Sequence, residues 1–441
     1  MAKTRRSRNA SGSGSNKMLP LNQSIPLGIQ HVFAMFAGNI TVPIIVAGVF
    51  GSTTAEKIFL IQMALFVAGV ATIIQTVGYK SIGSRLPIIQ GTSFAFIPII
   101  LPFKAVGLGA VLTAAFIGGI FQMWIGKMLK PIRHMFPPLV TGIVVLMIGV
   151  SLLKVGFMYA GGGGWLMNNK PEIFGNVNHL FISFTVLVVA LIAHQKGKGM
   201  VSSASILIGI IAGYIVAMLL GMINYGKIAS AEWFAFPMPF QYGIDFVWGI
   251  VILMLFMSIV TTIETIGDIS ATTMGGANRE ATDKELSGGI MADGLGTAFG
   301  AMFNALPNTS YSQNAGLVAY TGVISRHVGT IAGIILILLG LFPKLGGIIA
   351  AMPESVIGGA AIIMFGLITA AGIKLISQSE MNQRTMLILA LSLSFGIGLS
   401  LLPQFVAHIP DFGIQLKLLL TTGLIPAGLL AFILNATLPK K

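Results

Sequence analysis

The chain has 441 residues, of which 55% are hydrophobic and 9% are charged, and its mean hydropathy is +0.90. No soluble fold of this length buries so much apolar surface, so the composition predicts a multi-spanning membrane protein. The formal net charge of +13 comes from basic residues scattered through short loops. That scatter argues against a nucleic-acid-binding patch and fits membrane topology. The chain contains no cysteine, which excludes disulfide bonds and thiolate metal sites.

Residues 1–25 are predicted to form a disordered cytoplasmic tail. Four basic residues precede the Ser/Gly-rich run SGSGS, and this composition is typical of a flexible segment. No apolar region with a small-residue cleavage site follows, so we expect no cleaved signal peptide. The first membrane span is expected to begin near Pro26.

Fourteen apolar segments follow the tail, and we interpret them as membrane spans. Four of them (the third, ninth, tenth and eleventh) are short or broken by polar residues, which leaves twelve spans as the alternative. The segments cover roughly residues 27–49, 57–78, 87–103, 105–126, 136–155, 179–195, 203–223, 246–274, 286–303, 307–325, 328–343, 354–376, 384–402 and 414–437.

The distribution of basic residues favours fourteen spans. If the amino terminus is cytoplasmic and every segment crosses the membrane, 19 of the 26 Lys and Arg residues lie on the inner side. Positive residues concentrate on the cytoplasmic side of membrane proteins. We therefore expect fourteen spans, with both termini inside.

Two sequence echoes indicate an internal duplication. Leu86-Pro87 precedes a polar patch in the third segment, and Leu306-Pro307 precedes another in the tenth, 220 residues later. The pattern Pro-x-x-Val-x-Gly occurs at Pro137 and again at Pro353. Halves of seven spans have opposite topology, so the two interrupted segments should meet near the membrane midplane.

The tenth segment, residues 307–326, is the first candidate site. Its first half is too polar to face lipid, and its second half is expected to form a short helix starting near Ala315 or Gly316. Irregular backbone at membrane depth is tolerated only where protein buries it or where it lines a cavity. The start of such a helix would direct free N–H groups towards a ligand beside Gln313 and Asn314.

Three acidic residues lie inside apolar stretches and are candidates for function. Glu264 and Asp268 are four residues apart and share one helix face, and Asp293 lies in the next segment. A charged group at membrane depth costs several kcal/mol, so such residues are functional candidates by default. Two close carboxylates disfavour double ionisation, so that one of them can hold a proton. The alternative is that they only accept hydrogen bonds from neighbouring Ser and Thr.

Two further side chains have both structural and functional interpretations. His31 lies in the first segment, and we expect it to support the site indirectly. Phe94 follows the polar patch of the third segment, where it could present an aromatic face to a flat ligand or simply pack in the core.

At these positions the sequence resembles the nucleobase/ascorbate transporter family of nucleobase-cation symporters. Its signature is matched by Gln313-Asn314-x-Gly316 followed by Thr321-Gly322, and its acidic motif by Glu264-x-x-Gly267-Asp268. Gln30-His31 and Ala292-Asp293-Gly294 match its first- and ninth-segment motifs. The four motifs occur in the family's order, and the resemblance covers essentially the whole chain, from about Pro26 to Pro439. The resemblance is closest to bacterial xanthine permeases, which share Gln at the first signature position where uracil-selective members carry Glu.

The resemblance implies an all-α protein that carries a purine, xanthine or urate, with protons across the bacterial inner membrane by an elevator-like movement. A core domain would comprise residues 26–130 and 246–343, with short strand and half-helix segments at positions three and ten. A gate domain would comprise residues 131–245 and 344–437 and would form the homodimer contact. No cofactor, metal or nucleic acid is implied; the partners are the purine, protons and the lipid bilayer.

The resemblance also implies roles for individual residues. Glu264 would hydrogen-bond the base, Gln313 would contact its amide edge and Asn314 would shape the pocket. His31, Asp268 and Asp293 would support the site or the proton path. Ser93, Phe94, Ala315 and Gly316 would complete the substrate site, although bacterial xanthine permeases typically have Asn at the positions of Ser93 and Ala315.

Three alternatives remain open from the residues. A uracil carrier would share the architecture, and so would an anion exchanger, although a carboxylate at Glu264 argues against a free anion. The third is a channel, against which the interrupted segments argue because they favour alternating access. The chain has no Gly-x-x-x-x-Gly-Lys-Ser/Thr motif and shows no ATPase of its own. We expect no enzymatic activity.

Overall fold

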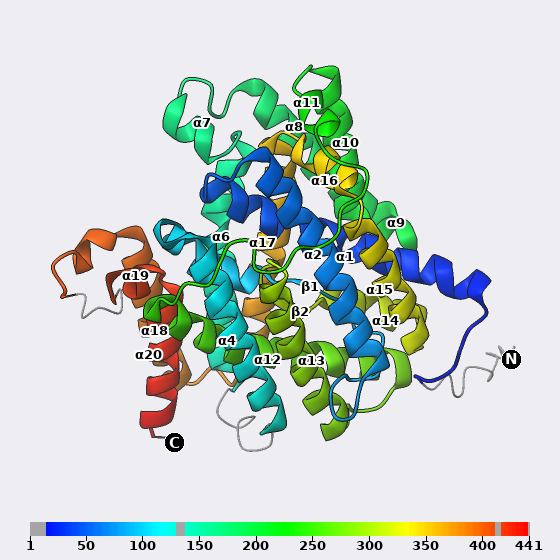
Figure 1. Cartoon of the computed structure of the whole chain (residues 1–441). Coiled ribbons are helices and arrows are strands. Elements are labelled where there is room, and N and C mark those ends of the chain that lie inside the picture. Colours follow the sequence, from blue (N-terminus) through cyan, green and yellow to red (C-terminus); the bar gives the residue numbers. More distant parts are fainter. Residues whose placement is uncertain (1–14, 129–136, 411–415, 440–441) are drawn as a thin grey trace, which may run out of the picture.

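A computed structural model describes residues 15–128, 137–410 and 416–439 (Figure 1). The chain is a bundle of helices around one very short sheet. The long and medium helices are α1 (Leu21–Val49), α2 (Thr54–Val77), α4 (Gly107–Lys127), α6 (Pro138–Ala160), α8 (Val177–Lys196), α10 (Ser205–Leu219), α12 (Trp248–Ala277), α13 (Asp283–Met302), α14 (Ser312–Thr321), α15 (Arg326–Gly340), α17 (Glu354–Ile376), α18 (Gln383–Leu401) and α20 (Leu424–Thr437).

Within the described ranges, eight helical stretches are long and apolar enough to cross a membrane. A ninth forms if α15 and α16 (Pro343–Ala350), which meet at a bend of 76°, count as one span. Each of the fourteen apolar ranges expected from sequence contains helical structure. The third and fourth ranges merge into one helical stretch, Phe94–Lys127. It is interrupted by non-helical dihedral angles at Phe103 and by Gly107 at φ +84°.

Two predicted helix starts are wrong. α1 begins at Leu21, so the last five residues of the tail expected at 1–25 are helical. Pro26 inside the helix removes one helical donor, the N–H that would bond to the Asn22 carbonyl. α14 begins at Ser312 and not near Ala315, because Tyr311 ends the preceding extended segment. Residues 1–14 of the tail, the expected domain boundary at 130/131 and the carboxyl-terminal 440–441 lie outside the described residues.

The two interrupted segments meet, as the sequence predicts. β1 (Gln90–Thr92) pairs antiparallel with β2 (Asn308–Ser310) near the centre of the bundle (Figure 1). Gln90 lies opposite Ser310 in the register. After β1 the chain continues into the 3-10 turn η1 (Phe94–Phe96) and the short helix α3 (Ile97–Ile100), and after β2 into α14. Each strand therefore delivers the start of a short helix to the same central region.

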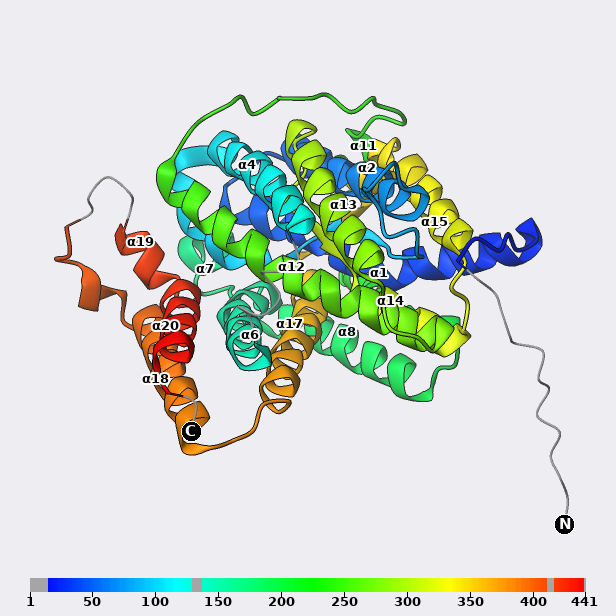
Figure 2. The same ribbon diagram turned by 90° about the horizontal axis from the view of Figure 1, so that it is seen from below.

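Helix packing repeats between the two halves of the chain. α2 packs against α15, and α4 packs against α13. α8 packs against α10. α18 packs against α20 (Figure 2). Counted along the fourteen expected segments, α2 and α15 are the second and eleventh, and α13 and α4 are the ninth and fourth. Exchanging each segment with the one seven places away therefore converts the α2–α15 pair into the α13–α4 pair. The same exchange converts the α8–α10 pair into the α18–α20 pair.

α6 and α17 are antiparallel and approach closely along their length. A methyl group on Gly142 would clash with Ile376, one on Gly149 with Thr369, and one on Gly358 with Ala160. Small residues let helix backbones approach in membranes, where packing replaces the hydrophobic effect between helices. The Pro-x-x-Val-x-Gly echoes thus supply equivalent glycines at opposite ends of one helix pair.

Candidate functional site

The site is built where α12 passes the end of β2 and the start of α14. Asp268 on α12 accepts hydrogen bonds from Ser310 Oγ and Ser312 Oγ, both at 2.6 Å. The two serines flank the junction between strand and helix. Charge-assisted hydrogen bonds are stronger than neutral ones, so Asp268 fixes this junction against α12 and is buried in doing so.

Glu264 lies one turn before Asp268 on the same helix and is only partly buried. Its carboxylate forms no hydrogen bond with any described residue, although it lies within electrostatic range of Asp268 and Asp293. A carboxylate without a donor inside a membrane bundle is costly to ionise, which makes Glu264 a candidate to bind a ligand or a proton.

Open space lies beside Glu264 and at the start of α14. A methyl group added to Gly267 or Gly316 would meet no described atom within 4 Å. Gln313, in the first turn of α14, is exposed and forms no hydrogen bond within the described chain. Both helices thus leave polar groups and bare backbone facing accessible space.

Towards their carboxyl-terminal ends, α12 and α14 pack closely against each other. A methyl group on Gly275 would lie 2.4 Å from Ala319 Cβ, and one on Gly276 would lie 2.7 Å from Val318 Cγ1. Asp268 meets the start of α14 and Gly275 meets its end, so the two helices run in the same direction. The first turn of α14 has no side-chain cap, so its free N–H groups add a partial positive charge near Glu264.

Asn314 and Ala315 point away from this space. Asn314 Nδ2 donates to the His31 carbonyl oxygen at 2.9 Å and lies 2.9 Å from His31 Nδ1. Both side chains are buried, and Ala315 is 4% exposed. The first turn of α14 is thereby attached to α1, and His31 contributes to the site only through Asn314.

Asp293 on α13 occupies the centre of a second buried network. It accepts hydrogen bonds from Gln90 of β1 and Thr265 of α12, and a longer one from Gln75 of α2 at 3.5 Å. Gln75 also accepts from the Ser84 amide at 3.2 Å. Asp293 therefore ties β1 to three helices and does not face the open space beside Glu264.

Sequence reasoning did not identify Gln75, Thr265 or Tyr311 as parts of this framework. Tyr311 donates from its hydroxyl to the Thr92 carbonyl at 2.8 Å and so joins the two interrupted segments. Gln75 could have been predicted as a buried hydrogen-bonding residue, because a primary amide in an apolar run is unfavourable unless it is paired. Thr265 carried none, since threonine bonds readily to its own helix.

A proline in α1 explains another link to β1. Pro43 has no N–H, so the carbonyl of Asn39 lacks its helical donor. Thr92 Oγ1 donates to that carbonyl at 2.7 Å, and the Thr92 amide donates to Asn39 Oδ1 at 2.8 Å. The helix and the strand therefore satisfy each other's backbone at membrane depth.

Ser93 and Phe94 follow β1. Ser93 is buried and accepts from the Ala95 amide at 3.3 Å, so it caps η1. Phe94 is partly buried and meets Phe365 of α17 edge to face, with ring centroids 5.5 Å apart. Phe94 thus lies between β1 and the α6/α17 pair.

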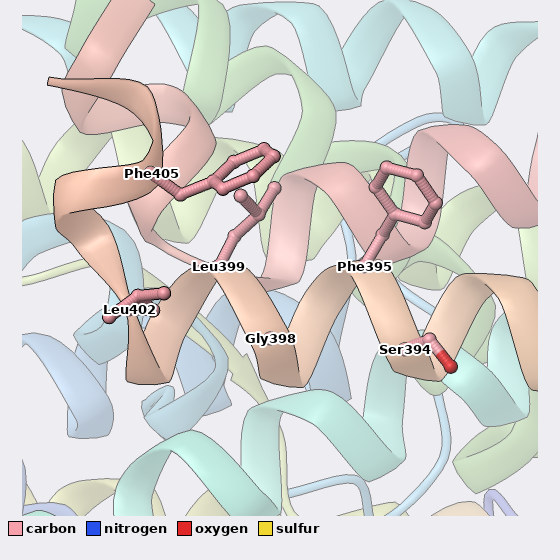
Figure 3. Close-up of a pocket in the computed structure, with 6 residues that line it drawn as sticks. All are labelled: Ser394, Phe395, Gly398, Leu399, Leu402 and Phe405. Atoms are coloured by element: carbon pink, nitrogen blue, oxygen red, sulfur yellow. The ribbon is translucent and has the colours of Figure 1, made fainter.

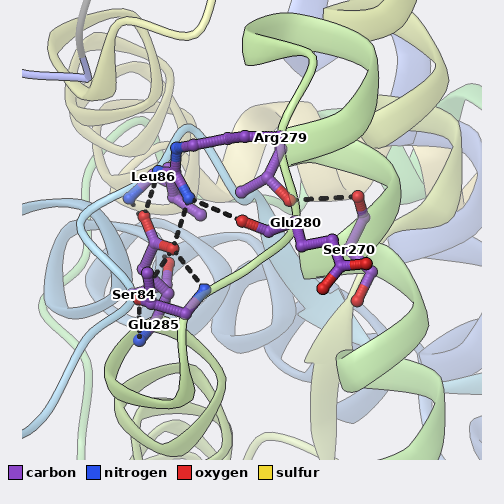
Figure 4. A network of polar contacts seen from close by, with 8 residues as sticks. Ser84, Leu86, Ser270, Arg279, Glu280 and Glu285 are labelled. Atoms are coloured by element: carbon purple, nitrogen blue, oxygen red, sulfur yellow. Dashed lines mark hydrogen bonds and ion pairs between the residues drawn. The ribbon is translucent and has the colours of Figure 1, made fainter.

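A polar cluster closes the link between α12 and α13 (Figure 4). Arg279 forms an ion pair with Glu285 and donates to the Glu280 carbonyl at 2.9 Å. Glu285 also completes a capping box with Thr282. Partial burial acts to raise the pKa of Glu285, but the hydrogen bonds from Arg279 and Thr282 outweigh it and hold that pKa below its usual range. Hydrogen bonding to Glu285 raises the pKa of Arg279.

An apolar groove of about 280 Å³ lies elsewhere, along α18 (Figure 3). Phe395, Leu399 and Phe405 line it with Ser394, Gly398 and Leu402. None of the candidate site residues contributes to it. Its lining offers no charged group with which to bind a polar ligand.

Buried carboxylates around two paired, interrupted segments, inside a bundle of apolar helices, define a membrane transport protein with discontinuous helices. Residues 22–405 match a family model described as "Permease family". The chain belongs to this family, the nucleobase/ascorbate transporter family that its motifs resemble.

Two relatives illustrate this membership. Xanthine permease XanP of Escherichia coli (strain K12) is 35% identical over 436 residues, covering 96% of this chain and 93% of the relative. Uric acid permease PucJ of Bacillus subtilis (strain 168) is 35% identical over 412 residues, covering 93% and 91%. The relatives are permeases, and the chain is a multi-pass membrane protein and not an enzyme.

Among solved structures, the transmembrane domain of a cyanobacterium bicarbonate transporter, BicA, has a similar fold. The TM-score is 0.60 at 13% sequence identity, and the alignment covers 96% of this chain and 100% of that domain. At this identity the likeness concerns the fold alone.

Proposed function

We propose that the protein takes up a purine nucleobase, xanthine or urate, together with protons across the bacterial inner membrane. The observation that carries this proposal is the unpaired carboxylate of Glu264 beside the uncapped start of α14, where Gln313 is exposed. The xanthine and uric acid permeases among the relatives support the substrate class.

The available groups match the chemistry of a purine dione. Such a ring presents N–H donors and C=O acceptors along its edges. Glu264 accepts, the Gln313 amide both donates and accepts, and the first N–H groups of α14 donate. Phe94 offers an aromatic face for the flat ring, and the small side chain of Ser93 would admit urate as well as xanthine.

Proton coupling follows from the different surroundings of the three acids. Asp268 and Asp293 each have hydrogen-bond donors, whereas Glu264 has none within the described chain. We assign the transported proton to Glu264, because its charge is the least compensated. Asp268 and Asp293 then act as positioning residues that hold the strands and α14 in place.

We further propose fourteen spans in two inverted halves of seven, with both termini cytoplasmic. The exchangeable helix pairings and the strand pairing support this arrangement. Residues 26–130 and 246–343 would form the core and residues 131–245 and 344–437 the gate, which also dimerises. Elevator-like movement of the core against the gate would expose the site alternately to each side.

The test is uptake of labelled xanthine into proteoliposomes with an imposed pH gradient. We expect a protonophore to abolish uptake. Among the competitors urate, uracil, guanine and hypoxanthine, we expect urate to inhibit xanthine uptake more strongly than uracil does. Dependence on sodium with no effect of the protonophore would contradict proton coupling. Stronger competition by uracil than by either purine would contradict the substrate assignment.

A further inference from the structure

Residues 231–247 form an extended strap between α11 (Tyr225–Ala229) and α12. In Figure 2 this segment is the green trace that runs from α11 past α4 to the start of α12. It contains no helix or strand. A connection of this length in a compact domain usually has a function of its own.

Hydrogen bonds attach the strap to four elements. The Ala235 amide donates to Leu341 O at 3.3 Å, and Gln62 of α2 donates to Ala235 O at 3.0 Å. The Phe240 amide donates to Met302 O at 2.9 Å, at the end of α13. Most of these partners lie at helix ends.

Two further side chains complete the attachment. Asn304 donates to Met238 O at 2.6 Å and accepts from the Tyr242 amide at 3.4 Å. Thr113 of α4 accepts from the Asp245 amide at 3.1 Å. All these partners belong to α2, α4, α13 and α15 or to the turns that follow them, so the strap follows any movement of this group of helices.

The strap turns a row of apolar side chains away from the protein. Phe234, Phe236, Met238 and Phe240 alternate along the chain and are 46%, 74%, 66% and 50% exposed. From Phe234 to Met238 this period of two is that of an extended segment with one apolar face, and Phe240 follows in a turn with φ +54°. Here that face points outwards, the reverse of the arrangement in a water-soluble protein.

Two aromatic residues extend the same surface. Trp233 precedes the row and is 73% exposed, and Trp248, at the start of α12, is 60% exposed. Lys344 lies over the Trp233 ring at 5.2 Å from its centroid. Trp residues with nearby cations collect where membranes meet water, because their rings are amphipathic.

The chemistry of the strap favours lipid over a protein strand as its partner. Pro237 and Pro239 remove two backbone donors from the row, so the strap is a poor edge for a partner strand to join. Its attachment to the ends of α13 and α15 sets it at the level where apolar helices meet headgroups. Exposed backbone is tolerated there, but not in the hydrocarbon core.

We infer that residues 233–248 are a lipid-binding surface whose aromatic row inserts into the headgroup and upper acyl region of one leaflet. Because the strap is bonded to α2, α4, α13 and α15, it links that group of helices to the membrane surface. The inference does not depend on which substrate is transported.

The test uses tryptophan fluorescence in proteoliposomes. The chain has four Trp residues, so replacing Trp124, Trp165 and Trp248 by Phe leaves Trp233 alone. We expect stronger quenching by lipids that carry a nitroxide near the glycerol backbone than by lipids labelled at the chain end, and weak quenching by aqueous iodide. A variant that keeps only Trp124, exposed on α4, is the control for access of the lipid label.

A second pair of variants links the signal to the row itself. Phe236→Asn with Met238→Asn, in the Trp233-only chain, should markedly reduce the lipid quenching, whereas Gln241→Asn should leave it unchanged. Quenching of Trp233 by iodide and not by lipid labels would overturn the inference. Protection from both quenchers would also overturn it, because protein would then cover the row.

Discussion

Among the described residues, Asp268 and Asp293 have hydrogen-bond donors and Glu264 has none, so we expect substitution of Glu264 to affect transport more than stability. Glu264→Gln keeps the size of the side chain and removes its charge. We expect uptake to be largely lost while the melting temperature in detergent stays close to that of the parent. Asp268→Asn is the matched control, and it should lower the melting temperature because Ser310 and Ser312 lose a charged acceptor. Full proton-coupled uptake by Glu264→Gln would remove this residue from the mechanism.

Gln313 is expected to set the class of substrate. Gln313→Glu replaces a group that donates and accepts with one that only accepts at pH 7. A ligand acceptor left unpaired should cost about 1–3 kcal/mol, or roughly tenfold to a hundredfold in affinity. We expect weaker binding of xanthine and urate, with uracil less affected. A lowered melting temperature with all affinities reduced equally would instead assign Gln313 a packing role.

The sequence singled out candidate residues that the structure brings together, but it did not predict the direction of each side chain, and their roles stay predictions. Glu264, Asp268 and Asp293 stand out because charge is rare in apolar runs, and the structure brings all three into one region. The different surroundings of Gln313 and Asn314 could not be predicted, since they depend on the start of α14 at Ser312. A shift of three residues rotates a helix by most of a turn, which places Asn314 against α1.

At the scale of elements, one ion pair joins helices from opposite sides of the proposed domain boundary. Lys57 of α2 lies 3.9 Å from Glu354 of α17, and Tyr159 of α6 donates towards the Ile44 and Ile45 carbonyls of α1. Both charges are largely removed from water. Removal of one partner should therefore destabilise the protein by a few kcal/mol.

The pair predicts a double-mutant result. Lys57→Glu should lower the melting temperature, and adding Glu354→Lys should recover much of the loss. Lys154→Glu, at an exposed Lys of α6, is a control for the change in net charge. If the double variant melts no higher than Lys57→Glu, the two charges are not coupled in the folded state.

The α12–α13 link predicts how stability changes with pH. The folded pKa of Glu285 lies below its unfolded value of about 4.5, so its contribution is complete above that pH and is lost as the pH falls through the folded pKa. Glu285→Gln should lower stability at pH 7 by up to about 1 kcal/mol. The difference from the parent should shrink below pH 4.5. A difference that grows on acidification would contradict this assignment.

The predicted elements succeeded where hydropathy was continuous and failed at polar junctions. The ranges expected for α2 and α17 differ from the structure by at most three residues at each end. α1 starts earlier than expected because polar Asn22, Gln23 and Ser24 hide its first turns from a hydropathy reading. The pairing of β1 with β2 could be predicted only from the repeated Leu-Pro, which indicated that two distant segments are equivalent.

For the whole molecule, the pairing of helices suggests two groups that move against each other. α4 and α13 pack against α12, which carries Glu264 and Asp268, and α2 packs against α13 and α15, while α6 and α17 are locked together through glycines. The Lys57–Glu354 contact and the Phe94–Phe365 contact lie between the two groups. If the groups must move for transport, a covalent link between them should stop it, and a link inside one group should not.

The absence of cysteine makes this test direct, because introduced cysteines are the only thiols. Lys57→Cys with Glu354→Cys should be joined by a short reversible bifunctional thiol reagent, with uptake lost and then restored by reductant. Thr76→Cys with Thr330→Cys is the control, since these side chains of α2 and α15 lie 3.0 Å apart within one group. Each uncross-linked pair provides the reference rate, which separates the effect of the link from that of the substitutions. If uptake persists with the Lys57–Glu354 positions fully cross-linked, the two groups do not separate there during transport, and the elevator-like movement is wrong.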